Sequence, residues 1–176
     1  MKVRTLFSMC SELFEKEQAR LWLRNCDRVG VAPRLHGRPA ISSLGKLEIG
    51  DRFSMSSSPL RSALNTGAHG FLEIGSDVSI GHGASIAAHA HVTVGDGTVI
   101  GPFVMIIDID FHETNDHASL GQAKPIRIGR GVRIGSNVVI LRGAMIGDGA
   151  VIASNSVVSR VLPPRRHASG VPARPD

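Results

Sequence analysis

The chain has 176 residues, a formal net charge of +5 at pH 7 and a sequence pI of about 10.0, and 42% of its residues are hydrophobic. That length fits one domain of ordinary size with a buried core. The basic residues are not interleaved with aromatic ones and no recognition helix accompanies them, so the charge does not indicate binding to nucleic acid. No apolar run approaches the roughly 20 residues that a helix needs to cross a bilayer, which argues against an integral membrane segment.

Residues 1–28 carry apolar side chains at helical spacing, Leu13 and Leu21 among them. This spacing predicts an amphipathic helix that packs against the rest of the chain and caps it. A position on a membrane surface also fits its mixture of apolar and basic residues. The segment lacks the apolar centre of a secretory signal, and two cysteines, Cys10 and Cys26, are too few for a disulfide framework, so we expect a reducing cytoplasm.

Residues 29–162 repeat with a period of six, in one run before an insertion at 107–125 and a second run after it. A period of six fits neither the 3.6 residues of an α-helix turn nor the alternation of an ordinary strand. It suits one flat side of a β-solenoid, in which three hexads close a triangular coil of roughly 18 residues. An all-β solenoid is therefore predicted, and its inward positions in the second run are Ile128, Ile134, Ile140, Ile146, Ile152 and Val158.

The last third of the chain, "IRIGRGVRIGSNVVILRGAMIGDGAVIASNSVVSRVLPPRRHASGVPAR", carries a family resemblance. It resembles the hexapeptide-repeat acyltransferases, in the branch of sugar and polysaccharide O-acetyltransferases that includes the maltose and galactoside acetyltransferases. The resemblance runs from about Leu47 to the C-terminus, and it implies a left-handed parallel β-helix, a homotrimer and acetyl-CoA as the donor. The periodicity itself predicts the solenoid but not its hand, and the general preference for right-handed crossovers would favour the opposite one.

The insertion at 107–125 contains "DIDFHETNDH" and breaks the repeat. A loop of this length inside a compact domain is uncommon and usually functional. In the resembling family a loop near the middle of the solenoid carries the catalytic histidine, and "IDIDFHET" matches it with His112 at that position. An imidazole titrates near neutrality and suits the removal of a proton from a hydroxyl that attacks a thioester. A carboxylate would orient this imidazole, and Asp108, Asp110 and Glu113 all remain candidates.

The resemblance also implies contacts to acetyl-CoA in the second run and in the basic C-terminal segment, residues 163–176. Two serines would meet the pantetheine arm, a glycine would leave space for it, and a Ser-Arg pair stands where the family usually shows Thr-Lys. A further arginine lies where the family approaches the nucleotide, and guanidinium groups supply forked, permanently charged donors to phosphates. In that order the residues are Ser136, Ser154, Gly143, Ser159, Arg160 and Arg174.

Other histidines raise a second chemistry, since His82, His89 and His91 precede the insertion and His117 lies inside it. The γ-type carbonic anhydrases use the same solenoid with three histidines that bind zinc between subunits. Their ligands come from adjacent regular coils, whereas His89 and His91 share one hexad here, so we predict no metal site. We expect His82 to line the acceptor side of the cleft and His117 to be an ordinary surface residue.

Together these features predict an acetyl-CoA-dependent O-acetyltransferase that acts on a saccharide hydroxyl. Gly81 and Ala88 stand where the maltose and galactoside enzymes show an Asn and an acidic residue. The missing sugar contacts favour a polysaccharide precursor or a lipid-linked sugar over a free disaccharide. Three alternatives stay open: acetylation of the amine of a nucleotide-linked amino sugar, a non-catalytic solenoid that serves as scaffold or sugar-binding module, and the zinc enzyme.

Overall fold

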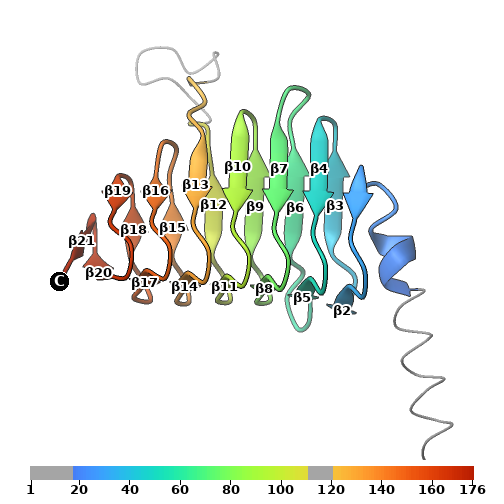
Figure 1. The fold of residues 1–176 in the computed structure, drawn as a ribbon. Coiled ribbons are helices and arrows are strands. Elements are labelled where there is room, and N and C mark those ends of the chain that lie inside the picture. The colour runs from blue at the N-terminus through green and yellow to red at the C-terminus, as the bar shows by residue number, and fades with distance from the viewer. Residues whose placement is uncertain (1–17, 111–120) are drawn as a thin grey trace, which may run out of the picture.

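The computed structural model describes residues 18–110 and 121–176. Within these ranges the chain winds into a three-sided prism of about seven turns, and each complete turn adds one strand to each of three parallel sheets (Figure 1). The architecture matches a left-handed β-helix, so the predicted fold class is confirmed.

The three sheets are called A, B and C in the order in which the chain visits them. Sheet A contains β1 (Arg28–Val29), β4 (Lys46–Ile49), β7 (Phe71–Ile74), β10 (His91–Val94), β13 (Ile126–Ile128), β16 (Met145–Ile146) and β19 (Val161–Leu162). Sheet B contains β2 (Arg34–His36), β5 (Ser54–Ser56), β8 (Ser79–Ile80), β11 (Val99–Ile100), β14 (Arg133–Ile134), β17 (Val151–Ile152), β20 (His167–Gly170) and β21 (Ala173–Pro175). Sheet C contains β3 (Ala40–Ser43), β6 (Ala63–Thr66), β9 (Ser85–Ala88), β12 (Met105–Ile107), β15 (Val139–Ile140) and β18 (Val157–Val158).

Two corners of the prism position the residues discussed below. At corner BC the chain passes from sheet B to sheet C, and at corner CA it passes from sheet C to sheet A. The insertion leaves the prism at corner CA, between β12 and β13 (Figure 1). Val92 of β10 nevertheless pairs with Ile126 of β13, so the coils before and after the insertion stack as direct neighbours. The insertion therefore adds residues without interrupting the ladder of sheet A.

The aliphatic residues of the six-residue repeat fill the prism. All of the inward positions predicted for the second run are at most 4% exposed, and Val132, Val138, Ala144 and Ala150 beside them are fully buried. A glycine follows three of these six aliphatics, and Gly135 illustrates its steric reason. A Cβ at Gly135 would lie 2.6 Å from the backbone nitrogen of Ser154 in the next coil, so a larger residue would push the coils apart.

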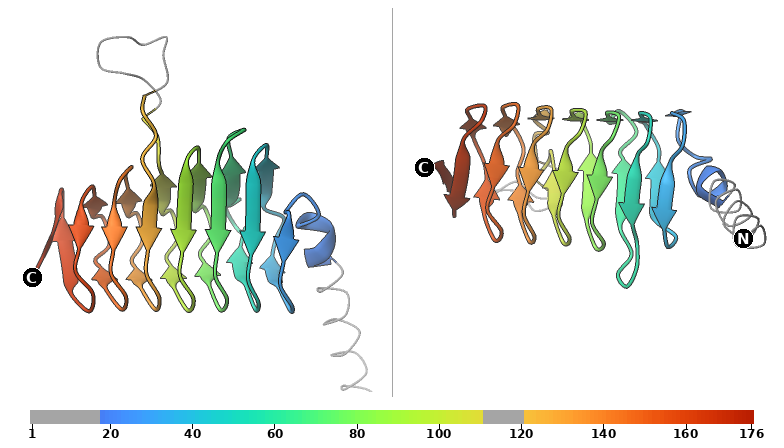
Figure 2. Two further views of the ribbon diagram at one scale, coloured as in Figure 1. Left: turned by 45° about the horizontal axis from the view of Figure 1, so that its top comes forward. Right: turned by 60° about the horizontal axis from the view of Figure 1, so that its bottom comes forward.

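The two ends of the prism are closed differently (Figure 2). Residues 18–22 form a helical turn. Ala19 within the turn and Leu23 just after it are buried and lie one helical turn apart, whereas Leu21 is 57% exposed. Leu21, one of the apolar residues whose spacing predicted the helix, therefore does not face the core. Residues 1–17 of the predicted helix lie outside the described ranges. At the other end, residues 163–176 contain β20 and the antiparallel β21, which closes the edge of sheet B.

Candidate functional site

The insertion begins and ends in a short stem at corner CA. The backbone oxygen of Asp108 accepts a hydrogen bond from the amide of Lys124 at 2.8 Å, and that of Asp110 accepts one from Gly121 at 2.9 Å. These two bonds hold the outgoing and the returning segment of the stem together where they leave the prism. The predicted base His112, with Glu113 and His117, lies in residues 111–120, outside the described part of the chain.

Asp108 ties the stem to the preceding coil. Its carboxylate has no exposed surface, and its two oxygens accept the backbone amides of His89 at 2.7 Å and Ala90 at 2.8 Å. Hydrogen bonds to an ionised acceptor are roughly twice as strong as neutral ones, so this contact is a firm clamp between coils. The imidazole of His89 faces this carboxylate, with Nδ1 3.9 Å from Asp108 Oδ1.

Asp110 ties the same stem to the following coil. Its carboxylate forms an ion pair with Arg142, whose Nη1 also donates to the backbone oxygen of Gln122 at 3.3 Å. The amide of Gly143 donates to the backbone oxygen of Lys124 at 3.1 Å. Both candidate carboxylates thus have partners from coils on either side of the insertion. Their role as orienters of His112 stays a prediction.

Five of the six residues expected to hold the cofactor lie in two columns on the edges of sheet C. Ser136 and Ser154 are at corner BC, where Ser154 Oγ accepts the amide of Ser136 at 3.0 Å. Gly143, Ser159 and Arg160 are at corner CA. The φ angle of Gly143 is +77°, a left-handed conformation that favours glycine, while a Cβ there would make only ordinary contacts at 3.7 Å with Lys124.

Arg174 and His82 stand apart from corner CA. Arg174 lies in β21, opposite Ser169 of β20, and is exposed. His82 precedes β9 at corner BC, where its ring centroid is 5.0 Å from that of Phe103. One protomer therefore does not bring His82 together with Asp108 and Asp110, because the width of sheet C separates them.

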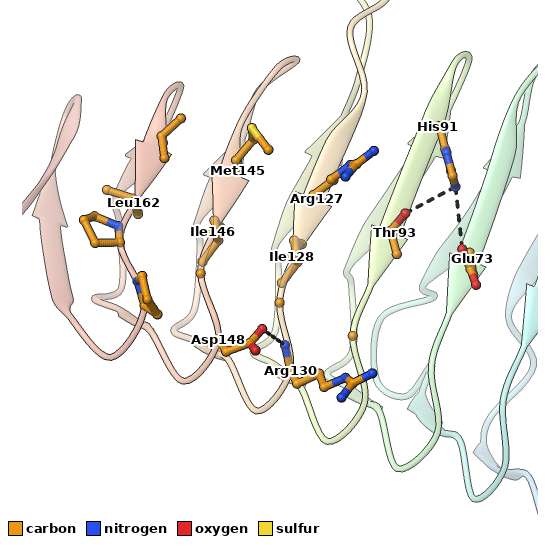
Figure 3. A pocket seen from close by; sticks show the side chains of 16 residues that line it. Glu73, His91, Thr93, Arg127, Ile128, Arg130, Met145, Ile146, Asp148 and Leu162 are labelled. Atoms are coloured by element: carbon orange, nitrogen blue, oxygen red, sulfur yellow. Dashed lines mark hydrogen bonds and ion pairs between the residues drawn. The ribbon is translucent and has the colours of Figure 1, made fainter.

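A groove of about 630 Å³ runs along the outside of sheet A (Figure 3). Apolar side chains such as Met145 line one part of it, and Nε2 of His91 lies 3.2 Å from Thr93 Oγ1 and 3.7 Å from Glu73 Oε2 in another. A second groove, of about 660 Å³, lies on sheet B beside Trp22. None of the site residues predicted from the sequence lines either groove, so we do not place the transfer reaction there.

The described residues contain neither a metal-binding group nor a membrane-spanning helix. Within residues 18–110 and 121–176 there is no group of three His, Cys, Asp or Glu side chains arranged to hold a metal ion. In the same residues no helix is both long and apolar enough to cross a membrane.

Residues 125–160 match the family model described as bacterial transferase hexapeptide (six repeats). The matched residues are the coils whose six-residue repeat and triangular cross-section are described above. These coils are built from hexapeptide repeats of that type.

This hexapeptide-repeat protein is 41% identical to Nodulation protein L of Rhizobium meliloti (strain 1021) over 109 residues, which is 60% of this chain and 60% of that protein. It is similar to a crystal structure of a hexapeptide-repeat-containing acetyltransferase from Vibrio cholerae, with 27% identity and a TM-score of 0.67 over 92% of this chain and 78% of that one. Another structure of that acetyltransferase holds acetyl-CoA. A galactoside acetyltransferase in complex with coenzyme A aligns with 26% identity and a TM-score of 0.63, over 94% of this chain and 70% of that one.

Two side chains of the hexapeptide-repeat protein enter the site region without having been predicted for it. Arg142 braces the stem through Asp110, and His89 faces Asp108. In the sequence His89 drew notice only as one of several clustered histidines. Both lie at the corner where the insertion leaves the prism, but His89 stands three residues after the inward Ile86 and Arg142 two after the inward Ile140, so the repeat gives no common signal for them.

Proposed function

We propose that this hexapeptide-repeat protein is an acetyl-CoA-dependent O-acetyltransferase that acts on a saccharide hydroxyl. The observation that carries the proposal is the likeness along nearly the whole chain to acetyltransferases whose structures hold acetyl-CoA or coenzyme A. A polysaccharide precursor or lipid-linked sugar is the proposed acceptor class. A cytoplasmic location is part of the proposal.

The reaction joins the acceptor oxygen to the acetyl carbonyl carbon and breaks the thioester bond. His112 takes the hydroxyl proton as that oxygen attacks, the tetrahedral intermediate collapses, and the proton passes to the departing coenzyme A sulfur. Asp108 or Asp110 stabilises the imidazolium, and a backbone N–H stabilises the oxyanion. The products are an acetyl ester and coenzyme A, so atoms and charge balance.

A homotrimer is the second part of the proposal. The cofactor residues stand in two columns on opposite edges of sheet C, and the flat wall between them has few long side chains to enclose a ligand. Corner BC of one subunit beside corner CA of another would form a cleft with two walls. Ser136 and Ser154 would then hold the pantetheine arm from one side, and Gly143, Ser159 and Arg160 from the other.

The test measures coenzyme A release from acetyl-CoA with methyl β-D-galactopyranoside and with its 6-amino-6-deoxy analogue as acceptors, and identifies the product by mass. His112→Ala should lower turnover at saturating acetyl-CoA by about 10²–10⁴-fold, the usual contribution of a general base. His117→Ala is the control and should lower it far less. If His117→Ala lost activity and His112→Ala kept it, the base would be His117 and not His112.

Other outcomes separate the alternatives. Transfer to the amine alone would make the protein an N-acetyltransferase. Stoichiometric zinc in the purified protein, together with carbon dioxide hydration, would identify the zinc enzyme. Binding of the saccharide without turnover, or without acetyl-CoA binding, would indicate a sugar-binding module.

A further inference from the structure

His89 is fixed at corner CA by the same carboxylate that anchors the stem of the insertion. Its backbone amide and that of Ala90 both donate to Asp108, which holds the peptide of His89 firmly in place. The side chain returns towards the same acceptor, with Nδ1 3.9 Å from Asp108 Oδ1. Backbone and imidazole of one residue therefore both face one fully buried carboxylate.

The edge of the ring that faces Asp108 is buried and unpaired. Within the described residues, Nδ1 of His89 is the one buried side-chain nitrogen or oxygen without a hydrogen-bond partner. Such an atom is costly to leave unmatched, so its presence calls for a reason. Each carboxylate oxygen can accept more than one hydrogen bond, and the Asp108 carboxylate is the acceptor that Nδ1 faces, at 3.9 Å. A hydrogen on Nδ1 is attracted to this carboxylate, which favours the tautomer with a lone pair on Nε2.

Gly67 in the preceding coil leaves the space that this ring occupies. A Cβ at Gly67 would lie 2.8 Å from Cδ2 of His89, so any larger residue would displace the imidazole. Nε2 lies farther from that Cβ position, at 3.5 Å, and because Nδ1 is buried we assign the exposed part of the side chain to the edge with Cε1 and Nε2. The side chain is 30% exposed. The ring is thus held on two sides and presents its acceptor nitrogen to solvent beside the stem.

We infer that His89 is an acceptor-positioning residue, whose neutral imidazole accepts a hydrogen bond at Nε2 from a sugar hydroxyl. The inference rests on the proposed acetyl transfer and names the acceptor class more narrowly, as one with a second free hydroxyl near the reacting one. Asp108 favours this tautomer, since a carboxylate that faces one ring nitrogen leaves the other as acceptor.

Two substitutions separate the role of Nδ1 from that of Nε2. In His89→Asn the side-chain amide donates to Asp108 in place of Nδ1, but nothing stands at the position of Nε2. In His89→Gln an amide group reaches the position of Nε2, while Asp108 loses its side-chain neighbour. Gly67→Ala displaces the ring and keeps both His89 and Asp108. His69→Asn alters an exposed histidine at the same corner of the preceding coil and serves as the control.

The experiment measures kcat and both KM values with acetyl-CoA and methyl β-D-galactopyranoside, together with Tm. His89→Asn and Gly67→Ala should raise the KM for the galactoside by about 3- to 10-fold, the weight of one neutral hydrogen bond, and leave the KM for acetyl-CoA unchanged. His89→Gln should restore part of the loss, and His69→Asn should match the wild type.

Two results would overturn the inference. The galactoside KM could stay at the wild-type value in both His89→Asn and Gly67→Ala. Alternatively, kcat and Tm could fall while both KM values rise together, which would mean that His89 has a structural role only. Failure of the wild type to acetylate any saccharide is a different result, because it would contradict the proposed function itself.

Discussion

Replacement of Asp108 by Asn tests whether the buried clamp at corner CA holds the stem to the prism. The carboxylate accepts two backbone amides, from His89 and Ala90, and has no exposed surface. Asparagine keeps the volume and one acceptor oxygen, but its NH₂ group would face the second amide, donor against donor. One hydrogen bond to a charged acceptor contributes about 1.5–3 kcal/mol, so Asp108→Asn should lower the free energy of unfolding by at least that much.

Thermal unfolding converts this loss into a measurable shift. For a chain of this size, each kcal/mol lowers Tm by about 2–4 °C, so we expect a decrease of about 3–12 °C. Circular dichroism at one fixed protein concentration is the assay, because the stability of an oligomer depends on concentration. Asp148→Asn is the matched control: Asp148 Oδ1 accepts the amide of Arg130 at 2.8 Å on the exposed surface, and an asparagine oxygen can keep that bond.

The control should change stability by no more than about 0.5 kcal/mol, as most surface substitutions do. Equal Tm values for Asp108→Asn, Asp148→Asn and the wild type would refute the reasoning. They would mean that the two amides find other partners when the carboxylate is lost.

Arg160→Ala and Arg174→Ala should each weaken acetyl-CoA binding by about 10- to 150-fold, the value of one charge-assisted hydrogen bond. The affinity of the wild type should also fall as the salt concentration rises. Calorimetry that showed unchanged affinity for both variants would contradict the predicted phosphate contacts. Burial, with a smaller contribution from Asp27, raises the pKa of the Cys26 thiol to about 12, so at pH 8 a Cys10→Ser protein should react with a disulfide reagent at least about ten-fold more slowly folded than unfolded. Because this pKa is raised on folding, the thiol should also make folding less favourable as the pH rises from about 9 towards 12. If the reagent labelled the folded and the unfolded protein equally fast, Cys26 would not be buried.

The fold could be read from the sequence where the repeat is regular. In the second run Ile146 stacks on Ile128, Ile152 on Ile134 and Val158 on Ile140, each 18 residues apart, although the last coil takes only 16 residues, from Ile146 to Leu162. In the first run the coils are longer, and Arg52 meets Asp77 25 residues away. Some of the added residues lengthen strands such as β10, where Val92 and Val94 are both buried, and others lie in the corners. The hexad therefore predicts the inward aliphatics but not the length of every strand and corner.

The site could be predicted only as far as neighbours in the sequence are neighbours in space. Asp108 and Asp110 were chosen for their closeness to His112 along the chain. In the fold their described partners come from other coils: Asp108 binds the amide of His89, 19 residues earlier, and Asp110 pairs with Arg142 in the coil that follows. Which corners stack depends on the length of every intervening coil. Long-range pairings of this kind leave no local pattern in the sequence.

Corner CA also explains how a solenoid accommodates reactive groups. Strand side chains point either into the aliphatic core, which excludes polar groups, or onto a flat outer wall, which contacts a side chain from one side only. At the corner, the backbone of one coil donates to Asp108 of the next, and Val92 still pairs with Ile126 beneath the insertion. The ladder and the Asp108 clamp therefore stabilise the corner, while its partly exposed side chains are freer to vary. Exchanges at the position of His89 should consequently change acceptor preference among related solenoids without altering the register of their strands.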